Sequence, residues 1–169
     1  MRKAMRMLAV GGIALGLFAA PAGSQTSPPS GFDQLKKLVG EWQSTDPKGV
    51  AFTNTIRLVS NGTALEETFQ NSKDNQMVTL YSPDGNRVAV THYCSAGNQP
   101  RMETDASTSD QKEFSFFFQG ATNLASPESG HMHHLTIKIA DNDHFSEEWT
   151  WHENGKDQSH AFQFTRKKS

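Results

Sequence analysis

The chain has 169 residues, enough for one domain on the usual range of roughly 100–200 residues per domain. Its 16 basic and 18 acidic side chains give a formal net charge of −2, and such a mildly acidic chain lacks the basic surface of a nucleic-acid-binding protein. The single cysteine, Cys94, excludes an internal disulfide framework and a Cys-rich zinc or iron–sulfur site.

The first 22 residues have the three-part order of a secretory signal peptide. Basic residues open the chain, an apolar run follows from Met7 to Ala20, and Ala20-Pro21-Ala22 forms an A-x-A cleavage signature. We expect cleavage after Ala22, with Ser24 as the alternative. Residues 23–30 then form a flexible linker before the domain at 31–169. The apolar run is too short to span a bilayer comfortably, so we expect a periplasmic or secreted protein with no membrane attachment after cleavage.

After the linker, one short helical segment is followed by segments in which apolar and polar residues alternate. Apolar residues at helical spacing predict the helix Phe32–Val39, which Gly40 ends. Strands are predicted at Glu41–Ser44, Phe52–Ser60, Thr63–Gln70, Gln76–Tyr81, Arg87–Cys94, Arg101–Ala106, Glu113–Gln119, His131–Ala140, His144–His152 and Ser159–Arg166. Short turns such as Asn61-Gly62 and Asn154-Gly155 join neighbouring strands antiparallel. This all-β pattern predicts a ten-stranded up-and-down barrel, with a sandwich as the alternative.

The apolar face of these strands also contains ionisable and amide side chains. Alternation places seven of them inward: Asn54, Glu67, His92, His131, His133, Glu147 and His160. Buried ionisable groups are costly unless they are paired or hydrated, so the pattern predicts a partly wet cavity. We expect Glu67, His92, His133, Glu147 and Trp149 to bind a ligand there. A β-bulge would reverse the assignments beyond it on any strand.

Two loops are candidates for the rim of this cavity, Ser95–Arg101 and Gly120–Gly130. Arg101 is expected to contribute to ligand binding there, because a guanidinium can bind a carboxylate through two hydrogen bonds. The alternative is that Arg101 faces solvent.

The string His131-Met132-His133 is the candidate for a metal site. On a strand, two imidazoles at i and i+2 share a face, and zinc or copper would need further ligands from His92, Glu67 or Glu147. The alternative is that these histidines form hydrogen bonds at the barrel mouth.

The sequence does not favour an enzyme. It contains no G-x-S-x-G, H-E-x-x-H, P-loop or dinucleotide-binding motif. Cys94 and His92 share a strand face as a nucleophile and its base would, and Glu67 and Glu147 could form an acid–base pair. Spacing alone establishes neither arrangement. We therefore predict no catalytic residue.

The segment Gly40-Glu41-Trp42, with Arg166 near the other end, resembles the calycin superfamily of lipocalins, fatty-acid-binding proteins and nitrobindin-like haem barrels. The resemblance implies that Trp42 packs at the closed end of a barrel under Arg166. The stretch from Thr91 to Met102, followed by Gly130-His131-Met132-His133 and Glu147-Glu148-Trp149-Thr150-Trp151, resembles an uncharacterised bacterial lipocalin-like family of the DUF1579 type. That resemblance covers roughly residues 32–168 and implies a barrel without an assigned ligand.

Together these features predict an exported barrel that binds a small molecule in an aromatic, partly polar cavity. The alternative is a metal- or haem-dependent barrel in which inward histidines hold the cofactor. We expect no cofactor, with haem or zinc as the alternatives, and the sequence leaves the oligomeric state open.

Overall fold

The computed structural model describes residues 31–46, 48–71, 76–106 and 110–168. The helical segment consists of α1 (Gly31–Leu35) and a turn of 3₁₀ helix, η1 (Lys36–Leu38). The strands are β1 (Gly40–Thr45), β2 (Ala51–Val59), β3 (Ala64–Asn71), β4 (Gln76–Asp84), β5 (Arg87–Tyr93), β6 (Gln99–Thr104), β7 (Glu113–Thr122), β8 (His131–Ile139), β9 (His144–Glu153) and β10 (Lys156–Arg166). The expected signal peptide and linker lie outside the described residues. Within the described ranges, no helix has the length and apolar character needed to cross a bilayer.

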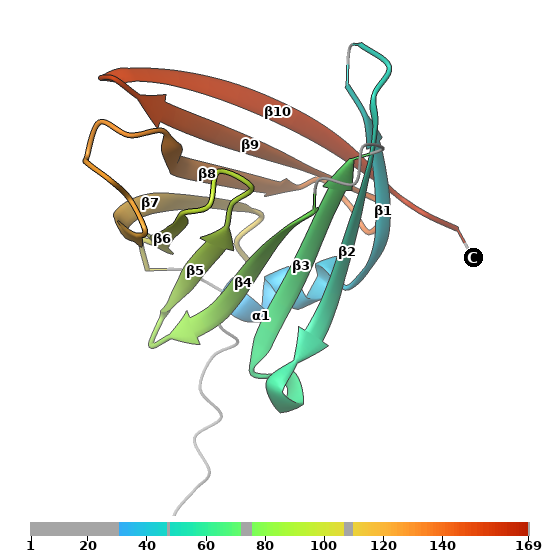
Figure 1. The fold of residues 1–169 in the computed structure, drawn as a ribbon. Coiled ribbons are helices and arrows are strands. Elements are labelled where there is room, and N and C mark those ends of the chain that lie inside the picture. The colour runs from blue at the N-terminus through green and yellow to red at the C-terminus, as the bar shows by residue number, and fades with distance from the viewer. Residues whose placement is uncertain (1–30, 47, 72–75, 107–109, 169) are drawn as a thin grey trace, which may run out of the picture.

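The strands form a closed antiparallel barrel in chain order (Figure 1). Each strand pairs with the next, and β10 pairs back with β1 through Trp42 opposite Arg166. The tight connections explain this order: Asn154 and Gly155 both have positive φ (51° and 69°), as a two-residue β9–β10 hairpin requires. The predicted ten-stranded up-and-down barrel with a short N-terminal helix is therefore confirmed.

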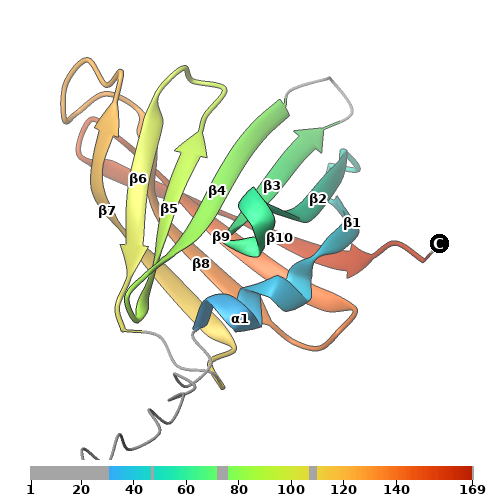
Figure 2. The same ribbon diagram turned by 90° about the horizontal axis from the view of Figure 1, so that it is seen from below.

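The helical segment lies across one end of the barrel, where Figure 2 shows α1 in front of the strand ends. Phe32, Leu35 and Leu38 are its buried side chains, each at most 3% exposed. Their burial against the barrel core stabilises a helix too short to be stable alone. This is the closed end of the barrel.

Gly40, Trp42 and Arg166 close the same end. The Arg166 guanidinium lies 4.0 Å from the centre of the Trp42 ring, and its Nη1 donates to Val39 O at 2.8 Å. Trp42 is fully buried, and its Nε1 donates to Leu38 O at 2.8 Å. Gly40 has φ +145°, a conformation that favours glycine, and a Cβ there would also clash with the Arg166 guanidinium.

An aromatic wall runs from this end towards the opposite one. Trp42 contacts Phe145 at 4.6 Å between ring centres, and Phe145 stacks on Phe164 at 4.7 Å. Two residues before Phe164 on β10, Phe162 continues the wall and contacts Phe69 at 5.1 Å between ring centres. The rings fill the lumen at the closed end and line it towards the open end.

Candidate ligand-binding site

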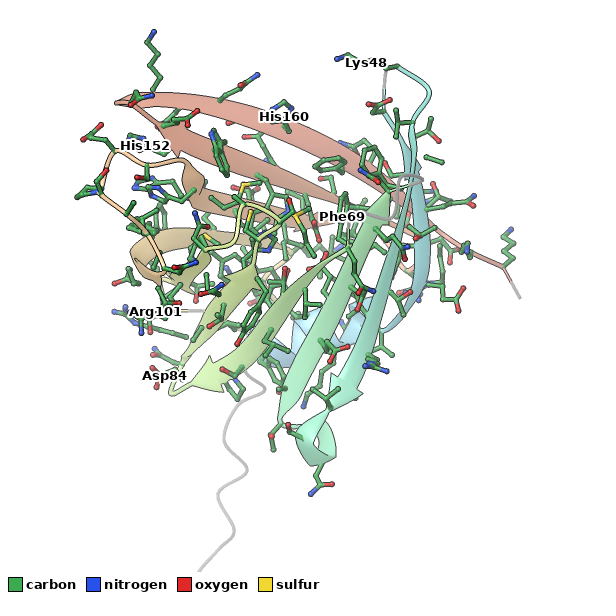
Figure 3. The ribbon with its side chains drawn as sticks, viewed as in Figure 1. Lys48, Phe69, Asp84, Arg101, His152 and His160 are labelled. Atoms are coloured by element: carbon green, nitrogen blue, oxygen red, sulfur yellow. The ribbon has the colours of Figure 1, made fainter. Side chains whose placement is uncertain are left out.

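A partly enclosed cavity of about 90 Å³ lies at the end of the barrel away from α1. Its surface is almost entirely apolar, and its lining residues are Glu67, Phe69, Met77, Thr79, His92, Met132, Trp149, His160 and Phe162. Figure 3 labels Phe69 on β3 and His160 on β10, two of the strands that contribute to the lining. A site for one water molecule needs roughly 10–15 Å³, so this cavity has room for a small organic group.

His92 provides a hydrogen-bonding atom in the cavity wall. It is 2% exposed, its ring centre lies 4.6 Å from that of Trp149, and its Nδ1 lies 2.9 Å from Thr79 Oγ1. Its Nε2 is buried and has no hydrogen-bond partner among the described residues. Burial lowers the pKa of His92 to about 4, so the ring is neutral at pH 7. A buried nitrogen without a partner is costly and is suited to a ligand.

Behind His92, two carboxyl groups share the barrel interior. Glu67 on β3 and Glu147 on β9 are each 1% exposed. Glu67 accepts hydrogen bonds from Asn54 Nδ2 at 2.5 Å and from the Tyr81 hydroxyl. Glu147 accepts one from Trp149 Nε1 at 3.0 Å, and its carboxyl group also forms a hydrogen bond with that of Glu67. Each strand presents these groups inward because its alternate residues face the core.

Burial and mutual repulsion keep this pair from carrying two full charges. Burial raises the pKa of Glu67, although its hydrogen bonds oppose the shift. Burial, and then the charge of Glu67, raise the pKa of Glu147 well above its usual range. Burial and the two glutamates also raise the pKa of Tyr81, so its hydroxyl remains a donor. The pair therefore favours holding a proton over carrying two charges, and the pKa of Glu147 is the more strongly raised of the two.

The structure brings Glu67, His92 and Trp149 to the cavity and Glu147 directly behind it, but it does not place His133 there. The register of β8 against β9 shifts between Met132 and His134, which leaves His133 in a β-bulge. The bulge turns Met132 into the cavity wall in its place. The inward placement of His133 expected from alternation is therefore wrong.

The two histidines of the predicted metal string instead join a third histidine. The ring centres of His131, His133 and His152 are 5.2–5.5 Å apart, and Phe118 contacts the first two. His92 contacts Trp149 and Thr79 instead, so it does not share a site with them. In the described part of the chain, no group of three or more His, Cys, Asp or Glu side chains is arranged to hold a metal ion.

Arg101 also lies away from the cavity. It is exposed on β6, between the buried Pro100 and Met102, and it points away from the barrel interior (Figure 3). The expected rim position is wrong because alternation along β6 sends residue 101 outward. His160, expected inward, lines the cavity but is exposed at its mouth.

Sequence reasoning missed Met77, Thr79 and Met132 of the cavity wall, and Tyr81, which donates to Glu67. Thr79 and Tyr81 follow the same inward alternation on β4 as their buried neighbours, so period two was a usable signal for both. Met132 had no such signal, because its position depends on the bulge.

Comparisons with known proteins support the fold. No protein-family model matches the chain, and no curated protein matches it, so the resemblance to the DUF1579-type family stays a prediction. The crystal structure of Rv2717c from M. tuberculosis is similar to this chain with a TM-score of 0.59 and 13% identity, covering 84% of this chain and 100% of that one. A protein of unknown function from the DUF3598 family of Nostoc punctiforme has a TM-score of 0.43 and 11% identity, covering 79% of this chain and 49% of that one. At this identity, the first likeness concerns the barrel alone.

Proposed function

We propose that this protein is an exported binding protein that holds a small, largely apolar molecule in the open-end cavity. The observation that carries the proposal is the buried, unpartnered Nε2 of His92 beside a partly enclosed apolar cavity. Apolar walls with a few placed polar groups are typical of small-molecule sites. The order of residues 1–22 supports export.

The size of the cavity favours a small ligand over haem. Its volume of about 90 Å³ is well below the roughly 300–1,000 Å³ of pockets that enclose drug-sized ligands. We therefore propose an organic ligand whose polar group contacts His92 Nε2 and whose apolar part contacts Trp149 and Phe162. A hydroxyl or amine suits this position, because either group can donate to His92 Nε2 in the tautomer whose Nδ1–H donates to Thr79 Oγ1.

Mass spectrometry of small molecules released from the purified, exported protein tests this function. Met77→Trp fills the cavity from its wall, whereas Val78→Trp adds the same ring to the outward face of β4 and is the control. We expect one compound to accompany the wild type and Val78→Trp and to be lost from Met77→Trp. Equal retention by both variants, or no compound with any of the three proteins, would contradict the proposed function.

A further inference from the structure

The barrel interior contains acidic groups without a basic partner. Glu67 and Glu147 are buried, and the buried residues of the described chain include no lysine or arginine. His92, the imidazole on the cavity wall, is neutral near pH 7 because burial disfavours its charged form. A buried carboxylate is costly unless a counter-charge or donor compensates it. The interior therefore lacks a cation.

The interior also contains buried polar atoms without a hydrogen-bond partner among the described residues. Asn54 Oδ1 is buried without a partner, and so is His92 Nε2, whose role as donor or acceptor depends on the ring tautomer. Glu67 lines the cavity, and its two oxygens accept from Asn54 and Tyr81. A carboxylate has about four acceptor positions, so Glu67 retains capacity for a further donor. An incoming N–H group would supply what this region lacks.

The cavity walls suit the body of a cationic ligand. Phe69 and Phe162 lie 5.1 Å apart at ring centres, and Trp149 forms another part of the wall. Aromatic faces attract cations, most strongly where water is excluded. A neutral ligand would gain the apolar contact but no charge–charge attraction to the carboxyl pair.

We propose that the ligand is an organic ammonium ion, whose amine lies against Glu67 and His92 and whose apolar body lies between Phe69, Trp149 and Phe162. The proposal rests on the proposed function and narrows its ligand class. The amine donates to the Glu67 carboxylate and to the imidazole nitrogen, and its charge replaces the missing counter-charge.

Three probes of the same ring and similar length test the charge requirement: 2-phenylethylamine, 2-phenylethanol and phenylacetate. Their affinities for the ligand-free, full-length exported protein are measured by isothermal titration calorimetry near neutral pH. We expect the amine to bind at least roughly tenfold more tightly than the alcohol, since charge-assisted hydrogen bonds are about twice as strong as neutral ones. Phenylacetate should show no binding, because it adds a second negative charge beside Glu67.

Glu67→Gln is the matching variant, and Glu66→Gln is its control on the opposite face of β3, where Glu66 pairs with Arg57 at 2.6 Å. We expect Glu67→Gln to lose the preference for the amine over the alcohol and Glu66→Gln to keep it. If Glu67→Gln does not fold, Glu67→Asp provides a second test, because the shorter side chain withdraws the carboxyl group from the cavity wall and should reduce the preference.

The outcomes separate the two proposals. Tighter binding of the amine, lost in Glu67→Gln, supports an ammonium ligand. Equal or tighter binding of the alcohol overturns the ammonium proposal and leaves the binding function intact. Failure of all three probes, together with no retained compound in the exported protein, overturns both.

Discussion

At the scale of single residues, His92 and the glutamate pair have opposite effects on how the stability of the barrel depends on pH. His92 must stay neutral, because its pKa of about 4 reflects the cost of burying a charged imidazole. Glu67 and Glu147 have raised pKa values, because burial favours their protonated forms. Lowering the pH therefore reduces the free energy of unfolding through His92 and increases it through the glutamates.

The first prediction concerns His92→Gln. A folded-state pKa lowered from 6.5 to about 4 gives stability that is present above pH 6.5 and lost as the pH falls towards 4. The wild type should lose about 3 kcal/mol more than the variant between these limits. Urea unfolding of both proteins at several pH values measures the difference, with His144→Gln as an exposed control. Parallel pH profiles for wild type and His92→Gln would show that the imidazole is not held neutral.

The second prediction concerns Glu147→Gln. The pKa of Glu147 is higher in the folded protein than in the unfolded chain. Its contribution to stability is therefore fully present below the usual pKa of a glutamate, and it is lost as the pH rises through the folded-state pKa. The amide cannot ionise, and its oxygen can still accept from Trp149 Nε1. The variant should therefore exceed the wild type by about 1–2 kcal/mol in free energy of unfolding at alkaline pH.

Denaturation of Glu147→Gln at alkaline and at mildly acidic pH checks this gain. The neighbouring Glu148→Gln is the control, since Glu148 is exposed on the other face of β9. A variant less stable than the wild type at alkaline pH would contradict the burial of a protonated Glu147.

At the scale of elements, strand alternation predicted the candidate site except where a strand is irregular. Glu67, His92 and Glu147 lie on strands whose register is regular at those positions, and each is buried as its parity requires. His133 lies in the β8 bulge, which no residue pattern in the sequence marks. A bulge reverses the side-chain directions beyond it, and it arises from how the backbones of two strands pair. The alternation of residues along one strand therefore could not locate it.

Barrel closure gives the third prediction. β1 pairs with β10 over a short register, and Arg166 adds bonds to Val39 O at 2.8 Å and Lys37 O at 3.0 Å beside its contact with Trp42. Arg166→Ala should lower the free energy of unfolding by about 2–4 kcal/mol, because it removes these two hydrogen bonds and the cation–π contact with Trp42. Lys167→Ala removes only an exposed ion pair with Glu41 and should cost less than about 1 kcal/mol. Similar midpoints for the two variants in urea would exclude this role for Arg166.

At the scale of the whole molecule, the sequence predicted the architecture of the barrel but not the size of its cavity. Turn residues such as Asn154-Gly155 fix short antiparallel connections, and these connections leave few ways to arrange consecutive strands. The cavity depends on how far side chains such as Met132 and Phe162 fill the lumen. That filling follows from three-dimensional packing across strands distant in sequence.

Export gives the fourth prediction. The mature protein should begin at Gly23, or at Gln25 if cleavage follows Ser24, because the small residues at positions 20–22 and 24 suit a signal peptidase. Intact-mass measurement of protein recovered outside the cytoplasm determines the first residue. A recovered protein that still begins with Met1 would contradict export by cleavage.

The most direct test of the central claim is a crystal structure of the exported protein with its co-purified molecule retained. The account predicts electron density for an organic molecule in the open-end cavity, with a polar atom within hydrogen-bond distance of His92 Nε2 and an apolar part against Trp149 and Phe162. A cavity that holds only water, or one closed by Met77 and Met132 while the molecule binds elsewhere, would contradict it.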